Sequence, residues 1–245
     1  MVGDLGGFAA AVYLRGIRYV GIPTTLLASV DSSVGGKTAV DLPAGKNLAG
    51  AFHHPSLVLC DPNTLNTLTP EILADGFAEV IKYAVIGDAD LFSMLDAPEA
   101  PDMETVIARC VSQKARIVEE DETDHGVRKH LNFGHTAGHA IELRSEFSLM
   151  HGHGVAIGMV IATEYAIRQG LCPESALPAL TDLLKKHHLP TETEYEIVDL
   201  YEAATRDKKR EGDEIDVVLP TGIGSCTLKR IPVTELPAFL SGGRV

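Results

Sequence analysis

The chain has 245 residues, with 21 Lys and Arg against 34 Asp and Glu, and a formal net charge of −13. This length suits one large domain or two small ones, and a hydrophobic fraction of 45% is ordinary for a globular protein and argues against disorder. The acidic balance argues against non-specific binding to nucleic acid or to a membrane surface, because both need positive charge.

Targeting and membrane signals are weak in this sequence. The first residues, MVGDLGGF, carry no basic segment, so we expect no secretory signal peptide. The best apolar run, residues 154–167, is interrupted by Glu164, so we expect no transmembrane helix. The four cysteines are widely spaced and form no CxxC pair, which is typical of reduced thiols in a cytoplasmic protein.

Residues 1–66 have the pattern of an α/β layer. The segment 3–8 predicts the start of a helix. Short apolar runs at 19–23, 38–42 and 57–61, which end in turn residues, predict strands. Between the first two runs, residues 24–33 predict a helix whose start is capped by threonine.

From residue 67 onward the pattern becomes helical, because apolar residues recur every three or four positions. The predicted helices begin at residue 70 and then span 88–95, 104–120, 135–143, 154–169 and 175–187. Residues 214–231 return to short strands. The predicted fold class is therefore α/β plus all-α, with an α/β part over 1–66 and a mostly helical domain over 67–245.

A histidine cluster is the most informative chemical feature. Four of the ten histidines, each next to glycine or one residue from it, fall close together in the sequence: His135, His139, His151 and His153. The first two are four residues apart on one face of a predicted helix, a common arrangement for a divalent metal. The other two follow after a loop and could reach the same point. Glu142 and Glu79 are both candidates for a completing carboxylate, and a set of capping and core-edge histidines is the alternative.

Residues 31–38, DSSVGGKT, nearly match the P-loop pattern GxxxxGK[ST], with Asp31 in place of the first glycine. A P-loop places its Lys and Thr at a helix N-terminus, whereas the segment after Thr38 predicts a strand. We therefore do not expect a nucleotide-hydrolysing P-loop. Ser33, Lys37 and backbone amides of this loop could still bind an anion.

Several basic residues lie in turn or motif contexts within this acidic chain. They are Lys37, Lys46, Lys82, Lys114, Arg128 and Lys208. Most lysines in any protein are solvated surface residues, and that is the simpler interpretation. If several of them converge on a metal site, they indicate a substrate rich in phosphate and carboxylate groups.

Five longer segments carry a more specific signal. They are VGDLGGFAAAVYLRG, GIPTTLLASVDSSVGGKTAVDLPAGKNLAGAF, FAEVIKYAVI, RKHLNFGHTAGHAIE and HGHGVAIGM. Together they resemble the 3-dehydroquinate synthase family of the shikimate pathway. The resemblance implies NAD and a divalent metal, zinc or cobalt, as cofactors, and a small-molecule substrate, 3-deoxy-D-arabino-heptulosonate 7-phosphate, which is cyclised to 3-dehydroquinate with loss of phosphate. It also implies a homodimer.

The resemblance assigns the metal to Glu79, His135 and His151, and so separates His135 from its helix neighbour His139. The positions that match substrate-binding or catalytic residues are Arg15, Lys37, Asn47, Lys82, Lys114, Arg128, Asn132, His139 and Lys208. The positions that match NAD-contacting residues are Gly3, Asp4, Thr24, Thr25, Asp31, Lys37, Lys46, Thr64, Leu65, Asn66 and Thr67.

Two departures from the family pattern stand out. His153 occupies a position where the family has Glu, beside the ligand His151. Family members also carry the first βαβ units and a Gly-rich pyrophosphate turn ahead of the segment that opens this chain. The resemblance therefore implies that residues 1–66 are the C-terminal part of a Rossmann-like NAD-binding domain, whose strands have an unpaired edge, and that 67–245 form the metal- and substrate-binding domain.

Two other functions remain open from the sequence. One is a related sugar-phosphate cyclase or a metal-dependent polyol dehydrogenase, although His139 together with Lys114, Arg128 and Asn132 favours the synthase. The other is an inactive fragment that lacks half of the NAD site.

In the synthase reaction that the resemblance implies, the metal polarises the hydroxyl group that is oxidised, and NAD takes and later returns the hydride.

Overall fold

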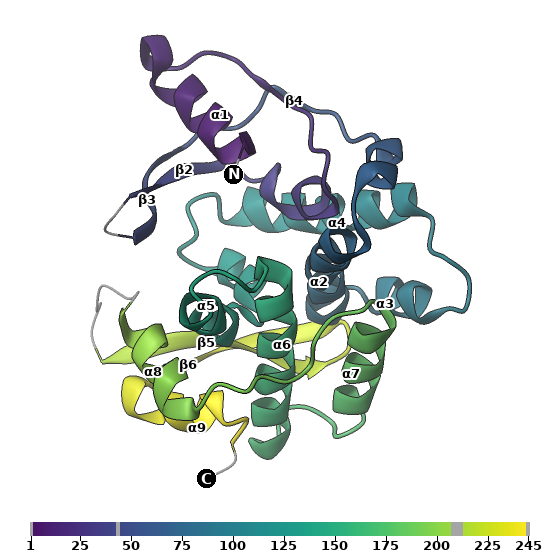
Figure 1. Ribbon diagram of the computed structural model, residues 1–245, viewed down its shortest axis with the longest axis vertical. Coiled ribbons are helices and arrows are strands. Elements are labelled where there is room, and N and C mark those ends of the chain that lie inside the picture. Colours follow the sequence, from purple (N-terminus) through teal and green to yellow (C-terminus); the bar gives the residue numbers. More distant parts are fainter. Residues whose placement is uncertain (1, 43–44, 207–212, 244–245) are drawn as a thin grey trace. The chain divides into compact units, whose positions relative to one another are not determined.

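The computed structural model describes residues 2–42, 45–206 and 213–243 (Figure 1). Two compact units divide the chain, the first made of residues 1–76 and 102–128 and the second of 77–101 and 129–245. The predicted boundary at residue 67 lies inside the first unit. Helix α2 (Pro70–Gly87) and the 3-10 helix η4 (Val127–Asn132) each continue from one unit into the other.

The first unit contains a helix beside a hairpin. Helix α1 (Val2–Val12) contacts strand β2 (Lys37–Leu42), which pairs antiparallel with β3 (Gly45–Phe52). Gly7 of α1 faces Thr38 of β2, and the Thr38 hydroxyl donates to the carbonyl of Ala51 across the hairpin. The remaining elements of this unit are η1 (Tyr13–Arg15), β1 (Val20–Gly21), η2 (Ala28–Ser32), β4 (Leu57–Val58), η3 (Pro62–Thr67) and α4 (Met103–Glu120).

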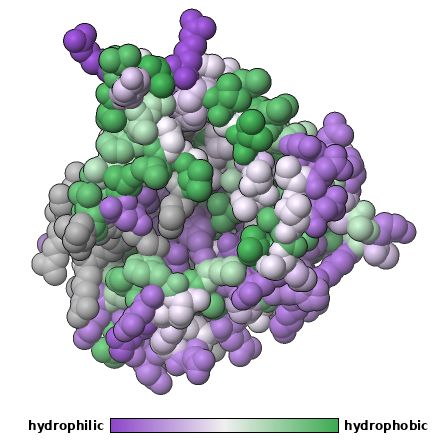
Figure 2. All heavy atoms as spheres, turned by 45° about the horizontal axis from the view of Figure 1, so that its top comes forward, coloured by the Kyte–Doolittle hydropathy of each residue, from purple (hydrophilic) through white to green (hydrophobic). Residues whose placement is uncertain are grey.

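Strands β1 and β4 form a short parallel sheet in which Val20 lies opposite Leu57. Among the described residues this sheet has two strands, so each strand has an unpaired edge. The side chains of Val20, Ile22, Leu57 and Leu59 are more than half exposed, and Figure 2 shows apolar residues at the surface of the molecule. The unpaired strand edge expected from the sequence is therefore present in the described part of the chain.

The second unit is built around α6 (His151–Arg168), which is buried on nearly all sides, as expected for a helix that is apolar all round. It contacts α5 (His135–Arg144), α7 (Ala176–Lys186), α9 (Leu236–Leu240) and strand β5 (Glu214–Gly222). The other elements are α3 (Ala89–Asp96), α8 (Ile197–Arg206), β6 (Ser225–Pro232) and η5 (Val233–Glu235). Strands β5 and β6 pair as an antiparallel hairpin.

The glycines near the histidine cluster bring α5 and α6 into backbone contact. A Cβ atom added at Gly158 would lie 1.9 Å from the carbonyl oxygen of Gly134, and one added at Gly154 would lie 2.9 Å from that of Gly138. Gly134, which precedes α5, has a φ of 79°, a left-handed conformation that glycine adopts without strain. No larger residue fits at Gly158 while the two helices keep this separation.

Most predicted elements are confirmed, and the differences are local. The residues after Thr38 form strand β2, so the segment 31–38 lacks the helix that a P-loop requires. Helix α6 begins at His151, three residues earlier than the periodicity indicated. Strand β3 and helices α8 and α9 were not predicted. None of the described helices is long and apolar enough to span a bilayer, and all four cysteines are free thiols.

We expect Gly158→Ala to destabilise the protein by about 1–3 kcal/mol, because its methyl group forces α5 away from α6. Urea unfolding followed by circular dichroism measures this change. Gly6→Ala in α1 is the control, because no atom lies within 4 Å of its added Cβ, so it should be neutral or stabilising by up to about 1 kcal/mol. Equal stability of Gly158→Ala and the parent would contradict the close helix contact.

Candidate active site

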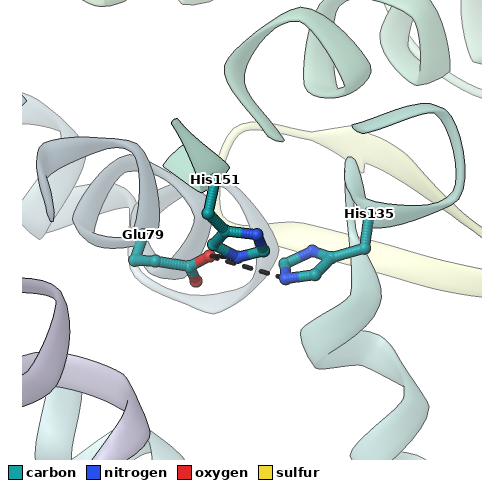
Figure 3. A group of neighbouring side chains, drawn as sticks. All are labelled: Glu79, His135 and His151. Atoms are coloured by element: carbon teal, nitrogen blue, oxygen red, sulfur yellow. Dashed lines mark ion pairs between the residues drawn. The ribbon is translucent and has the colours of Figure 1, made fainter. Parts of the chain in front are cut away.

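Glu79, His135 and His151 meet within the second unit (Figure 3). The Nε2 atoms of His135 and His151 lie 3.5 Å and 3.3 Å from the same carboxylate oxygen, Oε1 of Glu79. Figure 3 shows both imidazole rings directed at this carboxylate. Two nitrogens and one oxygen therefore converge on one point.

The spacing of these three donors fits a tetrahedral metal ion. Zinc binds imidazole nitrogen and carboxylate oxygen at about 2.0–2.1 Å, so adjacent donors in a tetrahedron are about 3.4 Å apart. The two nitrogen-to-oxygen distances of 3.5 Å and 3.3 Å match this value. Three protein donors also leave a fourth position open for a substrate oxygen, as in catalytic zinc sites.

Helix α2 supplies the carboxylate and its counter-ion. Glu79 and Lys82 are three residues apart on one face of α2, form an ion pair, and are each 1% exposed. A carboxylate buried this deeply needs a compensating positive charge, which Lys82 provides. The pair keeps Glu79 ionised, as a metal ligand must be.

His135 is held in a form that can bind a metal. Its Nδ1 lies 3.0 Å from the carbonyl oxygen of Phe133, so Nδ1 carries the proton and Nε2 presents its lone pair toward Glu79. Burial, which outweighs the attraction of Glu79, lowers the pKa of His135 to about 3. This imidazole is therefore neutral near pH 7.

His151 begins α6 and lies between two carboxylates. Its Nε2 faces Glu79, and its Nδ1 lies 3.4 Å from Oε2 of Glu142 on α5. Burial lowers the pKa of His151, but the hydrogen bonds to Glu142 and Glu79 outweigh it and raise the pKa to about 10. In the metal-free protein this imidazole is therefore protonated near pH 7.

A second group of donors overlaps the first, because His139, Glu142 and His151 also lie close enough together to hold an ion. The ring centroids of His135 and His139 are 5.3 Å apart, as their shared helix face predicts. Glu79 and Glu142, the two carboxylates between which the sequence could not choose, thus both contact His151. They do so through opposite ring nitrogens.

A cavity of about 240 Å³ opens beside these histidines in the second unit. Asn132, His135 and His139 line it, together with Asp216 of β5. Asp216 was not predicted. It accepts from Lys129 at 2.7 Å and from Arg230 at 2.9 Å, and these hydrogen bonds lower its pKa to about 2. Its signal in the sequence is a charged residue between the buried strand residues 215 and 217.

The first unit contains a larger cavity, of about 630 Å³, between α1, β1 and the start of β2. Five of the residues predicted to contact NAD line it: Gly3, Asp4, Thr24, Thr25 and Lys37. The other predicted NAD residues do not line it. The carboxylate of Asp31 instead accepts a hydrogen bond from Lys114, and residues 64–67 belong to η3. Lys46 lies in β3.

The predicted substrate residues of the first unit fall into two sets. Lys114 and Arg128 are buried: Lys114 donates to the carbonyl and carboxylate of Asp31, and Arg128 donates to the carbonyl of Gly35. The exposed set consists of Arg15, Lys37 and Asn47, of which Lys37 forms an ion pair with Asp124. Lys208 lies outside the described residues.

Two solved structures with the same fold have NAD+ and a divalent metal ion bound. A 2-epi-5-epi-valiolone synthase from Streptomyces hygroscopicus subsp. jinggangensis, with NAD+ and Zn²⁺ bound, matches 97% of this chain and 69% of its own with a TM-score of 0.87 and 31% identity. A 2-deoxy-scyllo-inosose synthase complexed with carbaglucose-6-phosphate, NAD+ and Co²⁺ matches 99% of this chain and 71% of its own, with a TM-score of 0.84 and 29% identity. The fold is therefore that of the sugar phosphate cyclases.

Sequence comparison narrows this class. Family models described as 3-dehydroquinate synthase N-terminal and C-terminal match residues 1–75 and 76–210. The 3-dehydroquinate synthases of Enterococcus faecalis and Streptococcus thermophilus are 44% and 42% identical over 98% of this chain, which spans 69% and 70% of their lengths. The chain belongs to the 3-dehydroquinate synthase family.

Substitutions that remove one histidine at a time distinguish the two overlapping donor groups by their effect on zinc affinity. If Glu79, His135 and His151 hold the ion, His135→Ala should lower zinc affinity by at least about 100-fold, because it removes a donor. His139→Ala should lower it by less than tenfold. Competition with a chromophoric chelator measures both affinities, and a larger loss in His139→Ala would favour the second group.

Metal binding should also release about one proton per ion near pH 7. His151 is protonated in the metal-free protein because its pKa is raised to about 10, and a metal binds the neutral ring. Zinc affinity should therefore rise about tenfold per pH unit between pH 6 and 8. Titration calorimetry in two buffers of different ionisation enthalpy counts the protons, and a value of zero would contradict the charged state of His151.

Proposed function

We propose that this chain catalyses the cyclisation of 3-deoxy-D-arabino-heptulosonate 7-phosphate to 3-dehydroquinate with loss of phosphate, using NAD and a divalent metal. The observation that carries the proposal is the Glu79, His135 and His151 group, whose donor spacing of 3.3–3.5 Å suits zinc and which borders a cavity lined by Asn132 and His139. Membership of the 3-dehydroquinate synthase family supports the assignment of 3-deoxy-D-arabino-heptulosonate 7-phosphate as the substrate.

In this proposal, Glu79, His135 and His151 hold the metal ion, zinc or cobalt, which acts as a Lewis acid toward the substrate hydroxyl that is oxidised. Lys82 keeps Glu79 charged through their buried ion pair. Asn132 and His139 line the cavity beside the donors, where their polar groups orient the hydroxyls of the substrate. His139 is exposed and can exchange a proton with the substrate.

The family resemblance also proposes several basic residues as contacts for the anionic groups of the substrate. Arg128 suits a phosphate or carboxylate because its planar guanidinium makes two parallel hydrogen bonds. Lys114 is also buried, so its charge is weakly screened. Arg15, Lys37 and Asn47 are exposed and are proposed as further substrate contacts.

NAD binds, in this proposal, in the cavity lined by Gly3, Asp4, Thr24, Thr25 and Lys37. NAD supplies a hydride acceptor that is restored within each turnover. The cavity volume of about 630 Å³ is within the range of small-molecule sites. Glycines at the start of α1 leave room for a ligand to approach the backbone. The cytoplasmic location and the homodimer stay predictions, and light scattering in solution tests the dimer.

Phosphate release from 3-deoxy-D-arabino-heptulosonate 7-phosphate, measured with NAD+ and Zn²⁺ or Co²⁺, tests the activity. Asn132→Ala should lower kcat/KM by about tenfold to 100-fold, because an exposed hydrogen-bonding side chain is lost from the cavity. Ser93→Ala, on the exposed face of α3, is the matched polar-to-alanine control and should keep full activity.

Two outcomes would contradict the proposal in different ways. No phosphate release from a chain that binds both metal and NAD+ would exclude the synthase reaction for this chain. Faster turnover of a sugar phosphate that lacks the carboxylate, or of a free polyol, would favour a related cyclase or a polyol dehydrogenase.

A substitution at Gly3 tests the NAD cavity separately. Gly3 lines the cavity and nothing lies within 4 Å of an added Cβ, so we expect the Gly3→Leu side chain to take up space in the cavity without disturbing the fold. We expect NAD+ affinity to fall at least tenfold while the urea unfolding curve stays the same. Unchanged NAD+ binding, measured by calorimetry, would place the cofactor elsewhere.

A further inference from the structure

The two histidines of the donor group differ in what holds the far side of each ring. Nδ1 of His135 faces a neutral acceptor, the backbone carbonyl of Phe133, at 3.0 Å. Nδ1 of His151 faces a carboxylate, Oε2 of Glu142, at 3.4 Å. Glu142 is 6% exposed, so this carboxylate is kept from bulk water and its effect on the ring is weakly screened.

We propose that Glu142 is a positioning residue, which acts through His151 to set the affinity and the ligand field of the metal site. It accepts the Nδ1 proton of His151 and so directs the Nε2 lone pair toward the point that Glu79 and His135 also face. The inference rests on the metal site of the proposed function, and it assigns Glu142 no direct contact with metal or substrate.

A carboxylate behind a metal-bound imidazole has two effects. It fixes the tautomer and the ring orientation, and it makes the ring a stronger electron donor; losing such a partner typically costs about 10–100-fold in metal affinity. A backbone carbonyl also fixes the tautomer, but it carries no net charge. His151 is therefore the stronger donor of the two imidazoles, and Glu142 is the cause.

The fold holds Glu142 and His151 in a fixed relation. The hydroxyl of Ser145 donates to the carbonyl of Glu142 at 2.8 Å and accepts from the amide of Leu149 at 3.1 Å. The amide of Phe147 donates to the same Glu142 carbonyl. This turn between α5 and α6 sets where α6 begins, and so where His151 lies relative to Glu142.

An alternative role for Glu142 is direct ligation of an ion, with His139 and His151. His151 has one nitrogen on each side, so a single neutral ring cannot serve both donor groups while it keeps the proton that Glu142 accepts. The positioning role therefore predicts one metal ion per chain. A second ion that depends on Glu142 and His139 would indicate ligation.

The test uses the full chain loaded with Zn²⁺ or Co²⁺ and compares Glu142→Ala with Glu142→Gln. We expect Glu142→Ala to bind one ion with an affinity about 10–100-fold lower. At saturating cobalt, the visible absorption bands of Co²⁺ should shift in Glu142→Ala, because the His151 ring is no longer oriented. Glu142→Gln keeps an oxygen acceptor, so it should largely restore the cobalt spectrum and part of the affinity.

Glu146→Gln is the matched control, because Glu146 is an exposed residue of the same turn. It should leave both the affinity and the spectrum unchanged. If Glu142→Ala does not fold, Glu142→Gln against the parent still decides, because loss of the negative charge alone should lower the affinity measurably.

Three results would overturn the inference. The first is a parent-like affinity and cobalt spectrum in Glu142→Ala. The second, where only Glu142→Gln folds, is a parent-like metal affinity in Glu142→Gln. The third is a stoichiometry of two ions in the parent that falls to one in the Glu142 variant. A parent chain that binds no metal would instead contradict the proposed function, so the two failures are distinguishable.

Discussion

The backbone contact between α5 and α6 is the constraint on which the candidate site depends. The carbonyl of Gly134 occupies the space where a side chain at residue 158 would lie, so the two helices touch without intervening side chains. This contact brings the His135 and His151 rings to a centroid distance of 5.2 Å, although they begin different helices. Larger residues at the contact would separate the helices, and the two imidazoles could no longer face one carboxylate.

The charges around this contact are balanced before any metal binds. Glu79 and Glu142 contribute two buried negative charges, and Lys82 and the protonated His151 contribute two positive ones. A divalent ion that displaces one proton therefore adds one net positive charge to the site. Such an excess charge would favour a bound anion, because the surrounding protein would screen it weakly.

The sequence predicted the parts of the site that depend on local spacing. His135 and His139 share a helix face because they are four residues apart, and this was confirmed. The choice between Glu79 and Glu142 depends on how α2, α5 and α6 pack, so spacing left it open and only the family resemblance chose. His151 follows a loop, as expected, but α6 begins at His151 and not at residue 154. The first turn was missed because the glycines beside His151 lower helix propensity, whereas in the fold they permit the α5 contact. Strand β3 was not predicted because its sequence is rich in Gly and Ala, which have low strand propensity.

The net charge of −13 does not show which basic side chains are paired with carboxylates and which are not. Lys114 and Lys37 each share their charge with a carboxylate, Asp31 and Asp124. Arg128, by contrast, donates to the carbonyls of Gly35 and Glu122, which are neutral. A bound anion must compete with a carboxylate for either lysine, but it meets the full charge of the buried guanidinium. Among these three residues, Arg128 is therefore the one best suited to bind an anion, because its two carbonyl contacts hold the guanidinium in place without neutralising it.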